Sequence, residues 1–196
     1  VNRRPQGFWE KLYLPAILQG MKTGAFAERV LVDRSQLVPV AGRIGWAEAS
    51  LLGCGVITGY GAVKNTARMP AGAMAVVIGA GGVGLNAIQG ARIAGARRIV
   101  AVDINEDKLS DARDFGATDT VLATQDKPWR AAKAAMGRGA DAVLVTVGAE
   151  RAYDDAPRYL AGGGKLIMVG MPATGARSHY EATSFAAART LARRVA

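Results

Sequence analysis

The sequence predicts an α/β fold in which a doubly wound parallel sheet is preceded by a small, partial β-rich segment. From residue 74 onward, short apolar runs alternate with stretches of helical pattern, and strands that alternate with helices form parallel sheets through right-handed crossovers. A glycine turn joins the first apolar run to the first helix. The composition, with 50% hydrophobic and 21% charged residues among 196, is that of a globular chain.

Each element of this sheet is predicted from its own local pattern. Strands are expected at the short apolar runs, residues 75–78, 99–102, 120–122, 142–147 and 165–169. Helices are expected between them, at residues 83–94, 106–115, 129–136 and 151–160. Asn105 is placed to cap the second helix and Gly116 to end it.

The residues before this alternation follow another pattern. Residues 1–24 show no sustained period and are predicted to be loop. Two segments of β-type composition follow, at 26–32 and 37–40, with a turn between them. They predict the end of a β-rich domain, which we assign to residues 1–45.

The α/β domain is assigned to residues 46–196. It opens with small and apolar residues from 46 to 65, which predict two helical pieces broken at Gly53-Cys54-Gly55. The sequence begins without Met and ends without a helix cap, so a piece of a longer protein is expected.

One cysteine and one histidine limit the chemistry of this chain. Cys54 alone cannot form an intrachain disulfide, which excludes a disulfide scaffold and fits a reducing compartment, so a cytoplasmic location is predicted. His179 follows the fifth predicted strand and is expected to be an exposed loop residue. With one cysteine and one histidine, this chain cannot by itself supply a metal site or a catalytic relay built from several His and Cys residues.

The net charge of +9 does not predict a nucleic-acid partner, because the basic residues are spread from Arg3 to Arg194 as singles and pairs. A nucleic-acid interface needs these basic residues clustered.

No charged residue lies between Arg68 and Arg92, yet six glycines interrupt that stretch. A buried strand, a turn and a buried helix explain it better than a membrane span, so no membrane association is expected.

The spacing G-x-G-x-x-G is formed by Gly79, Gly81 and Gly84, between the first apolar run and the first helix. Alone the motif is weak, but here a second strand follows and ends at Asp103, 19 residues beyond Gly84. Gly79 allows a tight turn, Gly81 lets a pyrophosphate approach the backbone, and Gly84 lets the helix pack on the strand. The helix N-terminus then faces the phosphates. The pattern predicts a Rossmann-type dinucleotide-binding domain.

Asp103 is predicted to accept hydrogen bonds from the adenosine ribose. A 2′-phosphate there would lie about 4 Å from a carboxylate, which costs roughly 1 to 4 kcal/mol, so NAD is predicted over NADP. Two alternatives stay open at this point. One is a glycine-rich turn that binds nothing, and the other is S-adenosylmethionine, which the third glycine disfavours.

Four segments of the sequence occur in a specific order and spacing. They are Gly53-Cys54-Gly55-Val56-Ile57-Thr58-Gly59-Tyr60-Gly61, the glycine turn, Val102-Asp103-Ile104-Asn105-Glu106-Asp107-Lys108, and Phe115-Gly116-Ala117-Thr118. Together they resemble the zinc-dependent medium-chain alcohol dehydrogenases, over about residues 26–170. The resemblance implies that residues 1–45 are a remnant of a GroES-like catalytic domain and that the remainder is an NAD-binding Rossmann domain.

The resemblance also implies residue roles. Cys54 matches a catalytic zinc ligand, and Thr58 a catalytic threonine that lies against the nicotinamide, as does Val83. Cofactor-binding roles fall on the glycine turn, on a ribose-binding pair and on two loops at strand ends: Gly79, Gly81, Gly82, Val83 and Gly84; Asp103 and Lys108; Val147, Gly148, Val169, Gly170 and Met171.

The sequence departs from the family pattern in its metal sites. The family builds its catalytic zinc site from Cys, His and Cys, of which this chain supplies Cys54, and the structural zinc lobe of four cysteines is missing. The resemblance therefore implies the cofactor-binding portion of a zinc-type enzyme that transfers hydride between an alcohol or aldehyde and NAD. The resemblance also implies a sixth strand that would begin around 193–196, where the sequence stops, so the domain is expected to be truncated there. This chain alone is expected to turn over no alcohol, and a homodimer is implied for the full-length enzyme.

Two other functions stay open beside this one. The first is a non-catalytic nucleotide-binding module. The second is a zinc-independent reductase of the same superfamily, against which Cys54 argues because such relatives need no thiolate there.

Overall fold

The computed structural model describes residues 27–40, 42–180 and 191–194. Contacts divide the chain into two units, residues 1–44 and 45–196, and the described strands all belong to the second unit. The loop expected at residues 1–24 lies outside the described residues. In the described part of the chain, no helix is both long enough and apolar enough to cross a bilayer.

The first unit has little regular structure among its described residues. Its 3₁₀ helix η3 (Arg34–Gln36) begins where the Asp33 carboxylate accepts hydrogen bonds from the backbone N–H and the hydroxyl of Ser35. The strands expected before and after this turn do not form in residues 27–40, where Leu31 and Val38 are 96% and 80% exposed. A strand is stabilised by a paired neighbour, and within the described residues these segments have none.

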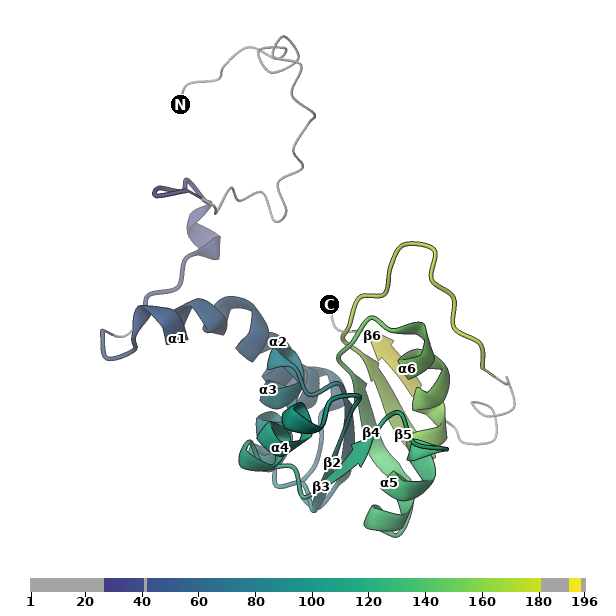
Figure 1. Cartoon of the computed structure of the whole chain (residues 1–196). Coiled ribbons are helices and arrows are strands. Elements are labelled where there is room, and N and C mark those ends of the chain that lie inside the picture. Colours follow the sequence, from purple (N-terminus) through teal and green to yellow (C-terminus); the bar gives the residue numbers. More distant parts are fainter. Residues whose placement is uncertain (1–26, 41, 181–190, 195–196) are drawn as a thin grey trace. The chain divides into compact units, whose positions relative to one another are not determined.

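The second unit is built on a six-stranded parallel sheet with the strand order β3-β2-β1-β4-β5-β6 (Figure 1). Its strands are β1 (Met74–Ile78), β2 (Arg98–Asp103), β3 (Asp119–Leu122), β4 (Ala140–Val145), β5 (Leu160–Met168) and β6 (Leu191–Arg194). The predicted doubly wound α/β fold is therefore confirmed. The strand order reverses between β1 and β4, and such sheets bind ligands at this point, outside the carboxyl ends of the strands.

Helices cover both faces of this sheet. The α-helices of this unit are α1 (Trp46–Leu51), α2 (Ile57–Gly61), α3 (Gly82–Ile93), α4 (Glu106–Asp114), α5 (Pro128–Met136) and α6 (Glu150–Asp155). Figure 1 shows α3 and α4 on one face and α5 and α6 on the other. The Asn105 side chain caps α4 as predicted, because it accepts hydrogen bonds from the N–H groups of Asp107 and Lys108 at 2.8 and 3.4 Å.

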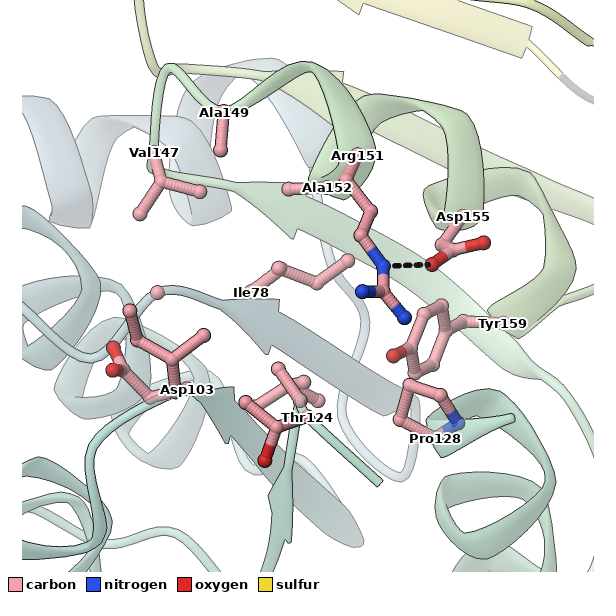
Figure 2. A pocket seen from close by; sticks show the side chains of 14 residues that line it. Ile78, Asp103, Thr124, Pro128, Val147, Ala149, Arg151, Ala152, Asp155 and Tyr159 are labelled. Atoms are coloured by element: carbon pink, nitrogen blue, oxygen red, sulfur yellow. Dashed lines mark ion pairs between the residues drawn. The ribbon is translucent and has the colours of Figure 1, made fainter. Parts of the chain in front are cut away.

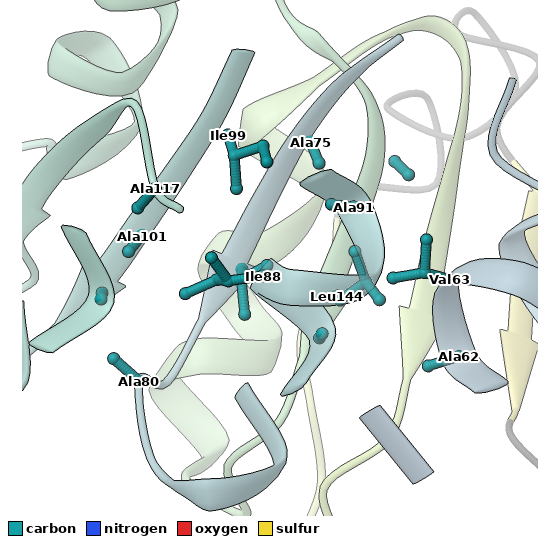
Figure 3. Close-up of a cluster of buried hydrophobic side chains, with 14 of the residues drawn as sticks. Ala62, Val63, Ala75, Ala80, Ile88, Ala91, Ile99, Ala101, Ala117 and Leu144 are labelled. Carbon is teal, nitrogen blue, oxygen red and sulfur yellow. The ribbon is translucent and has the colours of Figure 1, made fainter. Parts of the chain in front are cut away.

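Strand β1 shows how the two faces are filled. All five of its residues are buried, as expected for a central strand covered on both sides. Ala75 and Val77 belong to the cluster that contains Ile88 of α3 (Figure 3). Val76 and Ile78 point the other way, into the cluster that includes residues of α5 and α6. The alternation of period two therefore gives each face its own core.

The helical residues before β1 differ from the prediction, because they are not broken at Gly53 and Gly55. Both glycines keep a negative φ, and the backbone widens instead into two π-type stretches, η4 (Leu52–Val56) and η5 (Ala62–Ala67). Glycine is a poor helix former, but packing of this segment on α3 overrides that preference. The segment ends where Lys165 of β5 donates a hydrogen bond of 2.7 Å to the Ala67 carbonyl.

Strand β5 also differs from its prediction, since it begins five residues earlier and contains the glycine run. The short 3₁₀ helix η6 (Ala156–Tyr159) replaces the end of the expected helix. Ala140 pairs with Leu160, and Ala142 pairs with Lys165. A step of two residues along β4 therefore corresponds to a step of five residues along β5. The extra residues form a bulge, which Gly163 permits with a φ of 79°.

The sixth strand is present, which corrects the expectation that the chain stops where it begins. β6 pairs in parallel with β5, from Leu191 beside Lys165 to Arg194 beside Met168. Its sequence, Leu-Ala-Arg-Arg, contains no apolar run. Apolar runs reveal strands buried on both faces, so a strand without one gives no such signal.

The junction of β1 and α3 depends on two glycines. Gly79 has a φ of 99°, in the left-handed region that favours glycine. A Cβ on Gly84 would lie 1.8 Å from the Gly79 carbonyl oxygen. The tight turn and the close helix packing predicted for these two residues are therefore confirmed.

We expect Gly84→Ala to lower the free energy of unfolding by about 2 kcal/mol, since the added methyl group displaces α3 from the turn. Gly82→Ala is the matched control, because a Cβ there meets nothing within 4 Å, and its stability should be unchanged or slightly raised. Urea denaturation followed by circular dichroism compares the two variants. Equal stabilities would contradict the packing role of Gly84.

Candidate functional site

The carboxyl ends of β1, β2 and β4 border a cavity of about 240 Å³ (Figure 2). It lies where the strand order reverses. Its walls are mostly apolar and include Ile78, Val102 and Ile104. Figure 2 shows Asp103 on one side of the cavity and the side chains of Arg151, Asp155 and Tyr159 on the other. An apolar cleft with a few polar groups is the usual form of a small-molecule site.

The amino end of α3 is uncapped and open. Gly81 is its N-cap residue, no side chain caps the helix, and its first turn contains no acidic residue. A Cβ on Gly81 or Gly82 would meet nothing within 4 Å, so the backbone can be approached closely. The unpaired N–H groups and positive dipole end of a helix N-terminus bind phosphates. This end of α3 can therefore hold a phosphate group.

Asp103 is buried, at 7% exposure, and joins β2 to the glycine turn. One carboxylate oxygen accepts a hydrogen bond of 2.7 Å from the Ala80 N–H, and the other accepts one of 3.0 Å from the Asn105 N–H. A carboxylate oxygen has two acceptor sites, so each keeps one for a ligand hydroxyl. Sequence spacing predicted a ribose-binding carboxylate, and it gave no sign of the Ala80 contact.

The loops after β4 and β5 pack backbone against backbone. A Cβ on Gly148 would lie 2.4 Å from the Met171 carbonyl oxygen, and one on Gly170 would lie 2.2 Å from that of Val147. A Cβ on Gly79 would lie 2.4 Å from a methyl group of Val147. The structure thus brings these predicted residues together beside the glycine turn. Val169 precedes them and donates a 2.9 Å hydrogen bond to the Val145 carbonyl.

Two hydroxyl groups hold these loops in place, and neither was predicted from the sequence. The Thr146 hydroxyl lies 2.8 Å from the Gly79 carbonyl oxygen and 3.0 Å from that of Ile78, and it donates to one of them. The Tyr153 hydroxyl donates to the Gly170 carbonyl, and burial raises the pKa of Tyr153. Thr146 had a weak signal in the sequence, as a hydroxyl residue near the end of the fourth predicted strand, and Tyr153 had none.

The remaining predicted residues lie around the start of α3 and on α4. A Cβ on Gly59 would lie 2.3 Å from the Val83 carbonyl oxygen, so α2 meets α3 backbone to backbone, next to the half-buried Thr58. Cys54 is exposed within η4. Lys108 is exposed in the first turn of α4.

The described residues do not fit a catalytic zinc ion by themselves. Among them, no group of three or more His, Cys, Asp and Glu side chains could hold a metal ion, whereas catalytic zinc takes about three protein ligands. His179 is exposed and outside regular structure, as predicted. Its backbone N–H donates a 2.7 Å hydrogen bond to the Asp154 carboxylate. Cys54 is therefore one donor without a complete ligand set.

Comparison with known proteins finds similar dehydrogenases. Residues 82–194 match the family described as zinc-binding dehydrogenase. Over 109 residues the chain is 48% identical to alcohol dehydrogenase class-3 of Myxine glutinosa, and this stretch covers 55% of the chain and 29% of that protein.

Solved structures of dehydrogenases are also similar to this chain. Benzyl alcohol dehydrogenase from Acinetobacter calcoaceticus superimposes with a TM-score of 0.77 at 31% identity, over 81% of this chain and 44% of that one. An alcohol dehydrogenase zinc-binding domain protein from Burkholderia ambifaria gives a TM-score of 0.72 at 32% identity, over 74% and 39%. The match spans less than half the length of each of these relatives.

We expect Asp103→Ala to lower the free energy of unfolding by about 1–3 kcal/mol, because the Ala80 N–H loses its acceptor. Asp103→Asn should cost less, since its amide oxygen still accepts from one of the two N–H groups. Urea denaturation of both variants checks the order. A variant Asp103→Ala as stable as the unsubstituted chain would contradict the structural role of this carboxylate.

Proposed function

This chain belongs to the zinc-binding dehydrogenase family, and we propose that it forms the NAD-binding portion of an alcohol dehydrogenase. The observation that carries the proposal is the meeting of three features at one edge of the sheet. They are the open amino end of α3, the buried Asp103 carboxylate and the apolar cavity. Phosphate, ribose and base are joined in the same order in a dinucleotide.

The backbone at Gly81, Gly82 and Val83 would bind the pyrophosphate. These residues open α3, whose first turn is uncapped. Asp103 would accept hydrogen bonds from the ribose hydroxyls through the acceptor sites that the backbone leaves free. Lys108 has an exposed side chain three residues after the cap of α4 and is the proposed second ribose contact.

The cavity would hold the adenine ring. Ile78 and Ile104 supply apolar walls for a flat base, and Ile104, at 74% exposure, offers a surface that a ligand can cover. Arg151 lines the same cavity, and a guanidinium group can stack on an aromatic ring. Burial of these side chains against the base contributes to affinity through the hydrophobic effect.

The nicotinamide would lie toward the loops after β4 and β5. Residues proposed to line it are Thr58, Val83, Val147, Gly148, Val169, Gly170 and Met171. When bound, NAD would supply the carbon that accepts a hydride from an alcohol, and the alcohol would also release its hydroxyl proton to water and become an aldehyde. The close contacts at Gly79, Gly148 and Gly170 fix the position of these loops, and loops held in this way would orient the ring. Thr58 is the proposed catalytic residue at this end.

Cys54 is proposed as this chain's one zinc donor, and no step is assigned to a metal, because the described residues do not complete a site. We therefore infer that the 196-residue chain binds NAD and turns over no alcohol. An alcohol or aldehyde substrate and a homodimer are proposed for the complete enzyme, in line with the names of the relatives.

We expect Gly81→Ala to weaken NAD binding about tenfold or more, since its methyl group would occupy the approach to the helix N-terminus. Its stability should not change, because the added Cβ meets nothing within 4 Å. Gly61→Ala is the matched control, as its Cβ meets only the Asn65 side chain, at 3.7 Å. Isothermal titration calorimetry gives both Kd values, and equal values would contradict the proposed phosphate site.

We expect NAD to bind more tightly than NADP, by roughly fivefold to several hundredfold, because a 2′-phosphate would meet the Asp103 carboxylate. Asp103→Asn should narrow this ratio by removing the charge. Glu106→Gln is the control, since it removes an exposed carboxylate nearby that does not line the cavity. Titration with both cofactors measures the ratio. A ratio unaffected by Asp103→Asn would place the ribose elsewhere.

A further inference from the structure

The Tyr159 hydroxyl is a polar group without a protein partner that faces the cavity. Tyr159 is 2% exposed and lines the cavity, and within the described residues its hydroxyl makes no hydrogen bond. Every fully enclosed side-chain N or O atom in that part of the chain has a partner. The Tyr159 hydroxyl oxygen is therefore accessible from the cavity. A buried polar group without a hydrogen-bond partner can bind a ligand that enters there.

Asp155 lies on the same side of the cavity with hydrogen-bonding capacity to spare. Its carboxylate forms ion pairs with Arg151 at 3.8 Å and with Arg158 at 3.9 Å, both too long for hydrogen bonds. Arg158 also stacks on the Trp129 ring, 4.5 Å from its centroid. The Asp155 side chain is 19% exposed. A partly buried carboxylate without hydrogen bonds is an available acceptor.

The two groups act on each other. Burial, and then the charge of Asp155, raise the pKa of Tyr159, while Arg151 opposes them. The hydroxyl therefore stays protonated and can donate. Asp155 and Tyr159 together offer one acceptor and one donor at the end of the cavity away from Asp103, as Figure 2 shows.

An adenosine with its ribose at Asp103 would direct one edge of its base to this end. The ribose is attached to the five-membered ring of adenine, so the six-membered ring points away from the sugar. That edge carries an exocyclic amine, which donates, and a ring nitrogen beside it, which accepts. If this edge meets Asp155 and Tyr159, the amine can donate to the Asp155 carboxylate and the ring nitrogen can accept from the Tyr159 hydroxyl.

We propose that Asp155 and Tyr159 read the base of the dinucleotide, with the carboxylate accepting from the exocyclic amine and the hydroxyl donating to the adjacent ring nitrogen. This inference rests on the proposed function and adds a specificity to it. Hypoxanthine reverses the pattern, because it has a carbonyl oxygen in place of the amine and an N–H at the ring nitrogen. The Tyr159 hydroxyl can turn to accept, but the carboxylate cannot donate. Asp155 therefore supplies the preference for adenine, and Tyr159 strengthens binding of either base.

Calorimetric titration of the 196-residue chain with NAD and with nicotinamide hypoxanthine dinucleotide tests this. The unsubstituted chain should prefer NAD roughly tenfold. Asp155→Asn should bring the two Kd values to within about threefold, since a carboxamide can also donate. Tyr159→Phe should weaken both ligands about three- to tenfold and keep their ratio.

Tyr153→Phe is the matched control for Tyr159→Phe. It removes the hydroxyl of the other buried tyrosine of this region, which bonds to the Gly170 carbonyl and not to the cavity. It should lower the Tm and leave the Kd for AMP unchanged, because AMP lacks the nicotinamide end. Tyr159→Phe should weaken AMP as it weakens NAD.

The outcomes separate this inference from the proposed function. NAD binding with no preference over the hypoxanthine analogue, or with a preference that survives Asp155→Asn, would overturn base reading and leave the proposed NAD site standing. Asp155→Ser serves if Asp155→Asn does not fold, and it too should lose the preference because its side chain is too short to reach the base. Failure of the unsubstituted chain to bind NAD would overturn both proposals.

Discussion

The hydrogen bond between the Ala80 N–H and the Asp103 carboxylate is the contact on which the site depends. It is 2.7 Å long and joins residues 23 apart in the sequence. A buried carboxylate needs partners to offset its lost hydration, and Asp103 finds them in the backbone of the glycine turn and of the loop to α4. The turn is thereby fixed on the end of β2. The proposed ribose acceptor and the start of α3 consequently take one position relative to each other before any ligand arrives.

Close backbone contacts extend this constraint across the site. At Gly59, Gly84, Gly148 and Gly170, an added Cβ would lie within 2.4 Å of a carbonyl oxygen. Each glycine joins two elements that meet at the edge of the sheet. Main-chain contacts of this kind leave little room for adjustment, because interiors are densely packed. Backbone contacts therefore determine most of the geometry of the site, and side chains such as Val147 and Met171 contribute to its surface.

Local rules predicted much of this fold, and contacts distant in sequence decided the rest. The first four strands were placed from apolar runs because both faces of the sheet are covered. Gly79 and Gly84 were predictable, since a positive φ and a missing Cβ are properties of single positions. The bulge in β5, the unbroken helical segment at Gly53 and the strand β6 were not, because each depends on a packing or pairing partner. The same reason hid Tyr153 and Tyr159, whose roles exist only once the chain is folded.

Affinity and reactivity are thus assigned to different elements of the second unit. The groups proposed for the adenosine half of the dinucleotide come from the carboxyl ends of β1, β2 and β4 and from the segments directly after them. Thr58 and Cys54 come from the helical segment before β1, which packs on α3 through Gly59. Binding energy at the proposed adenosine site would therefore accumulate without Thr58 and Cys54, and it would hold the cofactor beside them. The contact at Gly59 is where these two contributions join, because it sets the distance between the segment that carries Thr58 and the helix that would hold the phosphates.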